Sequence, residues 1–419
     1  MEEQKEVACF QPTYMNEFQC DGSKCQSMCC KRPWQITFDT DTYEKYKHIQ
    51  PRYKSEAIRK HLKHWEDRNL YVVERWPDEK GACVFLDKDG LCRIQKEYGE
   101  DYLSLVCLGY PRLINIIDDF VECSLSLSCP VAAKLILLNK DPMTFEKCTV
   151  PDGRMVRHGQ TTINQNTHPQ TVFLVQVQCT CISILQNRDL SIDERLAMMG
   201  FFLWQTQEAA ESGDLDRLDA LCDAYMRADF AVGCKDLLGQ IRFSANAYLR
   251  RLIGEIANDM YGENGNFYGC NPTLWNTVMN LFGFSHAHHT VATAEMAKVY
   301  NEKLREFRWR FLTEYDYIWE NYLVNELFGQ LLPFNVDNNL INGYKVFLAE
   351  YKITELLILA GAYENDNANA EFLVYALENV NSIVVHSLDY LPNLAKTVLK
   401  HDEDMLSFMN IYLDIQGER

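Results

Sequence analysis

Apolar residues follow a helical period over the C-terminal part of the chain and form only short, irregular runs before it. Within residues 320–332, Leu323, Leu327 and Leu331 recur every four residues, which places them on one face of a helix. Two further segments have the same character: 341–362 and 366–400. The pattern predicts an α-helical domain over residues 171–419.

A start signal for one of these helices is visible in the sequence. Ser191 and Glu194 have the spacing of a capping box, in which each side chain bonds the other residue's backbone N–H. The pair predicts a helix that begins here and runs toward residue 211.

The N-terminal part has a different pattern. Residues 34–38 and 113–117 are predicted strands, because β-branched and aromatic residues dominate both. Apolar residues near helical spacing predict one helix over about 42–67, capped by Asp41 or Thr42. Short elements without a large apolar core are typical of small domains that a metal ion stabilises.

The two parts are separated by a polar stretch. An apolar run at 131–138 predicts a helix, and residues 149–170 follow with many Thr, Asn and Gln and two each of Pro and Gly. We interpret 149–170 as a linker, with a mobile loop over an active site as the alternative. The predicted fold is mainly α: a cysteine-rich, metal-centred α+β domain over 1–148, then a larger all-helical domain over 171–419.

Composition and charge exclude some classes of protein function. The chain has 419 residues, of which 47% are hydrophobic and 24% charged, so it is not a wholly disordered protein. Its net charge is −18, which argues against nucleic acid as a partner because phosphates require basic patches. An acidic body favours a cationic partner, although the charge also serves solubility.

Location can be predicted from what the sequence lacks. The first ten residues are acidic and polar rather than the basic and apolar start of a signal peptide. No apolar run approaches the roughly 18–20 residues that cross a bilayer. We expect a cytoplasmic protein with no membrane partner; the sequence does not indicate an oligomeric state.

The unusual feature is cysteine. Nine of the 16 cysteines lie within residues 20–129, and cytosolic thiols stay reduced, so metal binding or catalysis is favoured over disulfides. Eight of them form a C-x4-C-x3-C-C group, a C-x8-C pair and two single positions: Cys20, Cys25, Cys29, Cys30, Cys83, Cys92, Cys107 and Cys129. Thiolates select zinc, copper(I) or iron–sulfur clusters. Eight exceed the four that one centre needs, so either two centres exist or some sulfurs are buried bystanders.

The remaining chemistry-bearing residues are expected to be structural. The other cysteines are interpreted as small buried residues: Cys9, Cys123, Cys148, Cys179, Cys181, Cys222, Cys234 and Cys270. The histidines of HAHH, His286, His288 and His289, are interpreted as a polar loop or helix start. The arginines of LREFRWRF (304–311) are expected on a solvated helix face, with a carboxylate-binding patch as the alternative.

The cysteine motifs are similar to those of a known protein family. The stretches 11–46, 83–112 and 124–130 resemble the N-terminal part of the flagellin lysine-N-methylase family and of cysteine-rich, zinc- or iron-chelating domains. Residues 320–334 (ENYLVNELFGQLLPF) and the region around His386 are also similar to the family. The resemblance implies a cytoplasmic bacterial enzyme that transfers methyl groups from S-adenosylmethionine to lysines of flagellin and carries a [4Fe–4S] cluster. It places the family's cysteines on the eight positions above.

Three residues beside the cysteines are candidates for cofactor binding. Tyr110 and Arg112 follow Cys107 directly, and Trp34 follows the Cys-Cys pair; each is otherwise a structural residue of the site. No Gly-rich strand–turn–helix of the dinucleotide-binding type is visible, and no C-x3-C-x2-C spacing occurs. The sequence alone does not identify a catalytic base.

A second function fits the same residues. A non-enzymatic zinc- or iron-binding protein could use the helical domain to dock a partner. Brown colour in protein purified without air would indicate an iron–sulfur cluster and so favour the methyltransferase, whereas a colourless zinc protein would favour this alternative.

Overall fold

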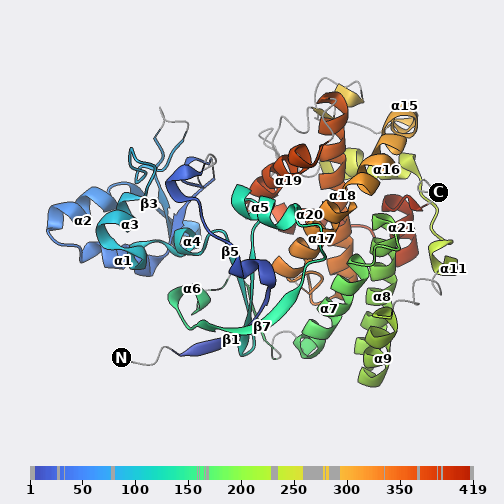
Figure 1. Ribbon diagram of the computed structural model, residues 1–419, viewed down its shortest axis with the longest axis horizontal. Coiled ribbons are helices and arrows are strands. Elements are labelled where there is room, and N and C mark those ends of the chain that lie inside the picture. The colour runs from blue at the N-terminus through green and yellow to red at the C-terminus, as the bar shows by residue number, and fades with distance from the viewer. Residues whose placement is uncertain are drawn as a thin grey trace. The chain divides into compact units, whose positions relative to one another are not determined.

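The computed structural model divides the chain into two compact units. The first unit comprises Met1–Ala132 and Phe145–Thr162, and the second comprises Ala133–Thr144 and Ile163–Arg419. The structure describes residues 5–25, 29–32, 34–76, 81–157, 159, 161–164, 166, 169–227, 235–257, 277–278, 280–282, 293–334, 336–365, 369–384, 386–387 and 390–415. Figure 1 shows the elements of both units, and each unit is described by itself.

A five-stranded sheet forms one part of the first unit. Its strand order is β7-β1-β6-β5-β8, in which β1 and β6 run parallel and β1–β7 and β5–β6 run antiparallel. The strands are β1 (Glu6–Pro12), β5 (Arg112–Ile117), β6 (Phe120–Leu125), β7 (Phe145–Pro151) and β8 (Thr161–Ile163). The strand predicted at 113–117 is confirmed as β5. Asp118, with φ 48°, provides the left-handed turn that a tight β5–β6 hairpin favours.

A three-stranded sheet with four short helices forms the other part. The sheet has the order β2-β4-β3, so the strand predicted at 34–38 is present but is only two residues long. These elements are β2 (Thr37–Phe38), α1 (Thr40–Lys47), α2 (Arg52–Arg59), β3 (Leu62–Trp65), β4 (Leu70–Val73), α3 (Arg93–Tyr98) and α4 (Leu105–Gly109). Phe38, Tyr46 and Phe85 lie in the shared core, against which Cys30, Cys92 and Cys107 pack.

The single helix predicted over 42–67 is wrong. The segment holds α1, α2 and the strand β3, and Pro51 stands at the N-cap of α2. Proline has no N–H to continue a helix and disfavours helical backbone in the residue before it, so α1 ends at Lys47. The cap is Asp39, whose carboxylate accepts a hydrogen bond from the Thr42 N–H at 2.8 Å, rather than Asp41 or Thr42.

The polar segment 149–170 carries regular structure. It includes the end of β7, the short helix α6 (Arg154–Arg157) and β8. In β7, residues 145–151 pair along their whole length with β1. Backbone pairing with a strand far away in sequence therefore orders polar residues that have no hydrophobic period of their own.

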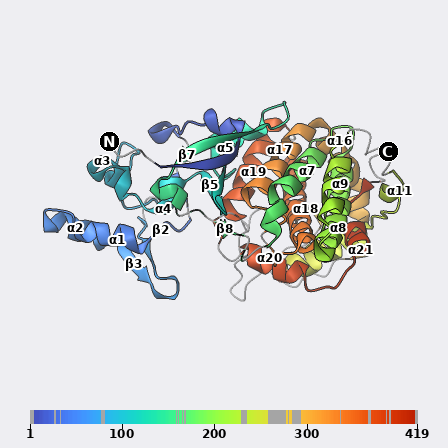
Figure 2. The ribbon, with the colours of Figure 1, turned by 90° about the horizontal axis from the view of Figure 1, so that it is seen from below.

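In the second unit, every regular element that the structure describes after residue 163 is a helix (Figure 2). The helix predicted at 131–138 is confirmed as α5 (Pro130–Leu137), and the two units divide within it. The longer helices that follow are α7 (Leu174–Leu185), α8 (Ile192–Ser212), α9 (Leu215–Tyr225), α16 (Arg305–Glu314), α17 (Asp316–Gly329), α18 (Leu340–Asn365), α19 (Ala370–Val384), α20 (Tyr390–Val398) and α21 (Met405–Tyr412). Shorter helices are α11 (Lys235–Leu238), α12 (Ala245–Leu249) and α15 (Ala294–Val299). The helical C-terminal part is as predicted.

Local signals and packing together fix these helices. The capping box of Ser191 and Glu194 is confirmed: the Glu194 N–H donates to the Ser191 hydroxyl at 3.3 Å, and the Ser191 N–H donates to the Glu194 carboxylate at 3.0 Å. α18 is buried along most of its length and packs against α8, α19, α20 and α21. It runs through the middle of the helices in Figures 1 and 2. Such a helix needs no solvent-facing polar side, and its charged residues Glu350, Lys352 and Glu355 are themselves buried.

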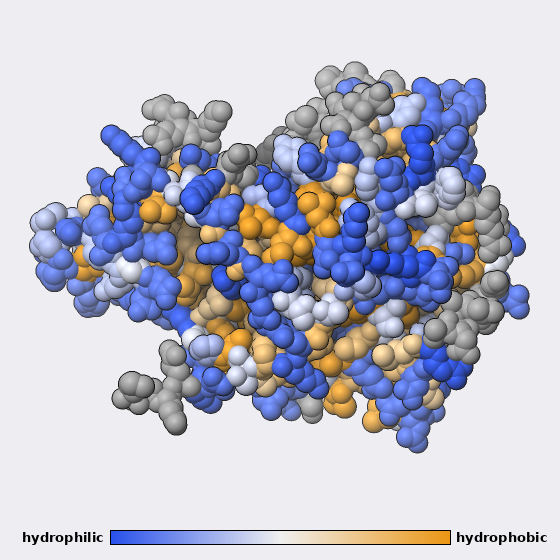
Figure 3. Space-filling model, viewed as in Figure 1, coloured by the Kyte–Doolittle hydropathy of each residue, from blue (hydrophilic) through white to orange (hydrophobic). Residues whose placement is uncertain are grey.

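None of the described helices combines the length and apolarity that a bilayer crossing requires. The face in Figure 3 is mostly hydrophilic, with apolar residues in patches.

We predict that Gly343→Ala destabilises the protein by about 3 kcal/mol, because a Cβ at this position of α18 would collide with the backbone oxygen of Pro333. Gly361→Ala is the matched control in the same helix: its Cβ would meet Phe372 at an ordinary 3.5 Å, and alanine would gain up to about 1 kcal/mol of helix propensity. Urea unfolding of both variants measures the difference. Equal stability of the two variants would show that α18 and the Pro333 segment do not approach this closely.

Candidate functional site

Five of the eight predicted cysteines converge in the first unit. Cys29, Cys30, Cys83, Cys92 and Cys107 lie close enough for the charge on one sulfur to raise the pKa of others. Burial is the largest cause of the raised pKa of Cys107, about 12, with the charges of Cys92, Cys83 and Cys29 adding to it. We call these residues the five-thiol group.

The other three predicted cysteines form a second set. The pKa of Cys129 is raised to about 11, first by burial and then by the charges of Cys20 and Cys25. Tyr110 interacts with both sets: burial raises its pKa, and so do the charges of Cys129 and Cys29. The electrostatic interactions thus connect Cys129 with Cys20 and Cys25, connect the other five cysteines with one another, and connect Tyr110 with both sets.

Backbone contacts place the Cys-Cys pair beside Cys83. The Cys83 N–H donates to the Cys30 carbonyl at 2.8 Å. The Arg75 guanidinium donates to the carbonyls of Cys30 at 3.3 Å, of Gly81 at 2.8 Å and of Trp34. Arg75 was not among the site residues predicted from the sequence, because a single arginine after a strand belongs to no recognisable motif. It holds three segments of the site through backbone atoms that no sequence pattern reveals.

The adjacent thiols Cys29 and Cys30 differ in acidity. A hydrogen bond from Cys30 lowers the pKa of Cys29 to about 7, with backbone N–H groups and the Arg75 charge also lowering it against the effect of burial. The same bond, together with burial, raises the pKa of Cys30. The pair therefore favours one thiolate and one thiol, and thiolate is the form that binds soft metals.

The donor set fits a thiophilic centre by its chemistry. The five-thiol group offers more than the four sulfurs that a [4Fe–4S] cluster or a structural zinc ion needs, and all five thiols are free of disulfide bonds. Among the described residues, no three His, Cys, Asp or Glu side chains are arranged to hold a metal ion. The metal-centred character of the N-terminal part and the eight-ligand assignment stay predictions.

Two of the three predicted cofactor residues are neighbours. The rings of Trp34 and Tyr110 lie 5.5 Å apart at 57°, and the Ser128 hydroxyl donates to the Tyr110 hydroxyl at 3.3 Å. The guanidinium of Arg112, at the start of β5, lies 5.5 Å from the ring centre of Phe18. A cofactor role for Trp34, Tyr110 and Arg112 stays a prediction.

A small pocket borders the core that packs the five-thiol group, since Ile58, Phe85 and Ile94 of that core line it. Its volume is about 200 Å³, and Tyr53, Lys54, Arg93 and Tyr98 contribute to its lining. Pockets for ligands of drug size measure roughly 300–1,000 Å³. The pocket is therefore too small to enclose S-adenosylmethionine.

The second unit contains a buried network of charges. The Arg308 guanidinium contacts Asp193 at 2.8 Å and Glu355 at 2.9 Å, and the Lys352 ammonium contacts Asp193 at 2.6 Å and Glu355 at 3.3 Å. Two carboxylates and two cations, all nearly inaccessible to solvent, balance one another. Burial alone would raise the pKa of Asp193, but Arg308 and Lys352 bring it below its ordinary range.

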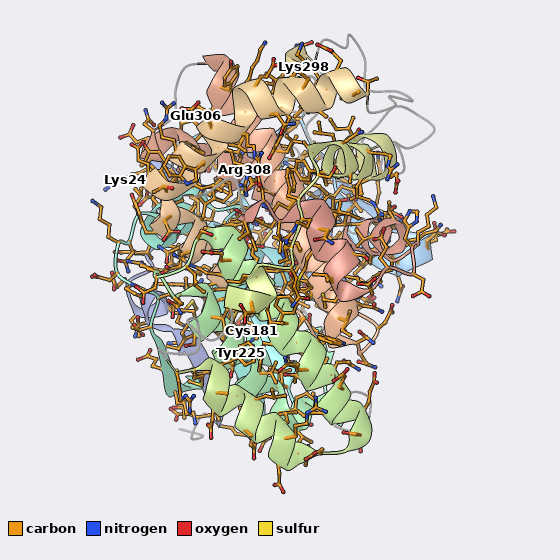
Figure 4. All side chains as sticks on the ribbon, turned by 90° about the vertical axis from the view of Figure 1, so that its right-hand side faces the viewer. Lys24, Cys181, Tyr225, Lys298, Glu306 and Arg308 are labelled. Atoms are coloured by element: carbon orange, nitrogen blue, oxygen red, sulfur yellow. The ribbon has the colours of Figure 1, made fainter. Side chains whose placement is uncertain are left out.

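The expected solvated face at 304–311 is wrong for Arg308. Glu306 is exposed on the same helix α16, whereas Arg308 is 2% exposed; Figure 4 labels both residues. Arg305 pairs with Asp414 at 2.6 Å, and Arg310 lies 5.7 Å from the ring of Phe307. Arg305 and Arg308 do bind carboxylates, but those of this chain, because segments distant in sequence bring the acids to them.

A second buried feature is a pair of carboxyls. Glu326 of α17 accepts hydrogen bonds from Gln330 at 2.6 Å and Asn381 at 3.0 Å, and Glu350 of α18 interacts with the same Gln330. Burial raises the pKa of Glu326 to about 7; burial and the charge of Glu326 raise that of Glu350 to about 8. At neutral pH Glu350 is therefore mostly protonated, whereas Glu326 lies near its midpoint.

Comparison with known proteins assigns the helical unit. Residues 179–412, more than half of the chain, match the family described as FliB lysine N-methylase C-terminal domain. The chain belongs to the FliB lysine N-methylase family. The match spans α8 to α21, and so includes both the charge network and the carboxyl pair.

Named relatives agree with the family. The lysine-N-methylases of Salmonella typhimurium (strain LT2) and Salmonella choleraesuis are each 30% identical, over 220 and 224 residues that make up 50% of this chain and 50% of theirs. The flagellar biosynthetic protein FliU of Salmonella muenchen is 36% identical over 148 residues, 34% of this chain and 83% of that protein. The match spans about half of the length of the two lysine-N-methylases. No solved structure matches the chain.

The structure of this FliB family member also describes the family-like helix and two of the cysteines predicted to be buried, but not the HAHH histidines. The family-like segment 320–334 forms α17 and the turn after it, and its polar residues are buried contacts: Glu320 pairs with Arg188 at 2.8 Å. Cys181 and Cys222 are buried in the helical unit, as expected; Cys181 is labelled in Figure 4. His286, His288, His289, Cys234 and Cys270 lie outside the described residues.

We predict that the carboxyl pair makes stability fall as pH rises. In the unfolded chain both groups ionise near pH 4.5, whereas the folded state keeps their protons to about pH 7–8. Their contribution is therefore complete below about pH 4.5 and is lost as pH rises through about 8, by several kcal/mol at about 1.4 kcal/mol for each unit between the folded and unfolded pKa. Urea unfolding at pH 5.5 and 8.5 compares the wild type with Glu326→Gln/Glu350→Gln, in which the loss should shrink.

The control for this experiment is Glu306→Gln, which removes an exposed carboxylate of α16 and should leave the pH dependence unchanged. An equal loss of stability in the wild type and the double variant would contradict the assignment.

Proposed function

We propose that this chain is an S-adenosylmethionine-dependent protein lysine N-methyltransferase that acts on flagellin in the bacterial cytoplasm and carries a [4Fe–4S] cluster. The observation that carries the proposal is the match of residues 179–412 to the FliB lysine N-methylase family. Two relatives are named lysine-N-methylase and a third is named a flagellar biosynthetic protein, which supports a flagellar substrate. The acidic chain suits a lysine-bearing partner through long-range attraction.

The proposed reaction moves one methyl group. The neutral amine of the substrate lysine attacks the methyl carbon bound to the sulfonium of S-adenosylmethionine, and the carbon–sulfur bond breaks. The products are methyl-lysine, S-adenosylhomocysteine and one proton. A free lysine has a pKa of about 10.4, so the site must favour the neutral amine by excluding water or by accepting its proton.

For the cluster we propose the five-thiol group. It supplies sulfurs from three separate stretches of the chain: Cys29 and Cys30, Cys83 and Cys92, and Cys107. Arg75 holds the Cys30 and Trp34 carbonyls, and the lowered pKa of Cys29 provides one thiolate before metal enters. When bound, a cluster with one open iron position could chelate the amine and carboxylate of the methyl donor. The ring pair of Trp34 and Tyr110 is the proposed neighbour of that donor.

We predict that Cys107→Ser lowers the iron content sharply, because it removes a sulfur that interacts with Cys29, Cys83 and Cys92 of the five-thiol group. Cys20→Ser is the matched control, since Cys20 is exposed and belongs to the second set with Cys129. Both proteins are purified without air, and iron and acid-labile sulfide are measured together with the visible absorption. The control should retain its iron and brown colour.

Iron loss in Cys20→Ser with retention in Cys107→Ser would place the cluster at the second set instead. Stoichiometric zinc without iron in the wild type would reject the cluster and favour the non-enzymatic metal-binding alternative.

We predict that the iron-loaded protein transfers labelled methyl groups from S-adenosylmethionine to flagellin. Peptide mass spectrometry should find the label on lysine side chains. Flagellin whose lysines have been acetylated is the substrate control, because an amide nitrogen is not nucleophilic. The absence of label from flagellin incubated with fully loaded protein, in the absence of air, would refute the proposed substrate and reaction.

A further inference from the structure

Three cysteines outside the predicted metal set lie on neighbouring strands of the five-stranded sheet. Cys9 is on β1, the strand between β7, which carries Cys148, and β6, which carries Cys123. Their separation along the chain hides this arrangement, because Cys9 and Cys148 are 139 positions apart. We call them the sheet thiols.

Strand register puts all three on one face. Cys9 stands directly opposite Cys148 in the antiparallel pair β1–β7. In the parallel pair β1–β6, Cys9 stands opposite Val121, and Cys123 is two residues further along β6. Because side chains alternate along a strand, Cys123 and Val121 share a face, which is also the face of Cys9 and Cys148.

The sheet thiols pack in a mainly apolar core, where the Cys9 thiol also donates to the Gln11 side-chain oxygen at 3.8 Å, and one of the three is accessible. Cys9, Cys123, Ile114, Val121 and Val156 form a small buried core, and Cys148 packs at its margin. Cys9 and Cys123 are 3% and 5% exposed, whereas Cys148 is partly exposed. A reagent in solution therefore meets Cys148 first.

We propose that Cys9 and Cys148 are a redox-sensitive pair that a small-molecule disulfide converts to a disulfide bond between β1 and β7. Directly opposed residues of an antiparallel pair have Cα atoms about 4.5–5.5 Å apart, within the roughly 4.4–6.8 Å that disulfides span. Cys123 lies diagonally on the other side of Cys9 and is hydrogen-bonded to it, but its burial keeps it from the small disulfide, so we expect it to stay reduced. The proposal is independent of methyl transfer.

The oxidation proceeds by two thiol–disulfide exchanges. The Cys148 thiolate attacks one sulfur of the small disulfide, whose sulfur–sulfur bond breaks to release one small thiolate. The Cys9 thiolate then attacks the Cys148 sulfur of this mixed disulfide and releases the second small thiolate. The two cysteines lose two electrons and two protons, and the small disulfide gains them to become two thiols.

The Cys9–Cys148 disulfide would link β7 covalently to β1. Residues Ala133–Thr144, which precede β7, belong to the second unit. β7 itself (residues 145–151) belongs to the first unit, where it pairs with β1. In the reduced protein these strands can separate when their backbone hydrogen bonds open. In the oxidised protein a covalent link holds them, so backbone amides of β1 and β7 should exchange hydrogen more slowly.

The experiment maps cysteine pairs in the full chain. Reduced protein is incubated with oxidised glutathione at mildly alkaline pH, free thiols are blocked with N-ethylmaleimide, and unreduced digests are analysed by mass spectrometry. We expect a linked peptide pair that contains Cys9 and Cys148 and that disappears on treatment with dithiothreitol. Cys148→Ser should abolish this pair, whereas the matched control Cys123→Ser should retain it.

The wild-type map alone decides the proposal if a variant fails to fold. A bond between Cys9 and Cys123, or a stable glutathione adduct on Cys148 without a second exchange, would overturn it. Protection of all three thiols by a bound metal ion, which Cys9→Ser would release, would also overturn it.

Discussion

The buried contact of Arg308 and Lys352 with Asp193 and Glu355 is the constraint on which the helical unit depends. It joins α8, α16 and α18, and the Asp414 N–H, just after α21, donates to Asp193 at 2.8 Å. Leaving one such charge without its partner in a protein interior costs about 3–5 kcal/mol. The helices can therefore pack in only those positions that keep all four charges paired. Apolar contacts alone would tolerate small shifts, since they have no direction.

The first unit is organised by different interactions. A compact aromatic core around Phe38, Tyr46 and Phe85 packs against the cysteines, and Arg75 fixes the nearby backbone through three carbonyls. The core is small, so bonds from sulfur to a metal would add stability that apolar burial cannot supply. This is the physical reason for proposing the cluster in the cysteine-rich part.

The cysteines of this protein lie in three different kinds of environment. The five-thiol group is crowded and includes one acidic thiol, the sheet thiols lie on an apolar strand face, and Cys181 and Cys222 are buried among helices. The same side chain is thus a proposed metal ligand in the first group, a proposed oxidisable pair in the second and a small packing residue in the third. Neighbouring charge and solvent access decide which chemistry each one has.

The sequence by itself determined the features that depend on near neighbours. The capping box of Ser191 and Glu194, the helical periods after residue 171, the strand at 113–117 and the family resemblance were all readable, because their residues interact within a few positions or form fixed motifs. Pro51 also gave a local signal, which the weak apolar period over 42–67 concealed.

Only the tertiary structure decided which distant residues meet. Arg308 is buried because Asp193 and Glu355 come from other helices, and the sheet thiols adjoin because β1 lies between β6 and β7. The split of the eight cysteines into five and three likewise follows from how separated segments pack. Such contacts depend on the path of the whole backbone, which spacing along one chain does not record.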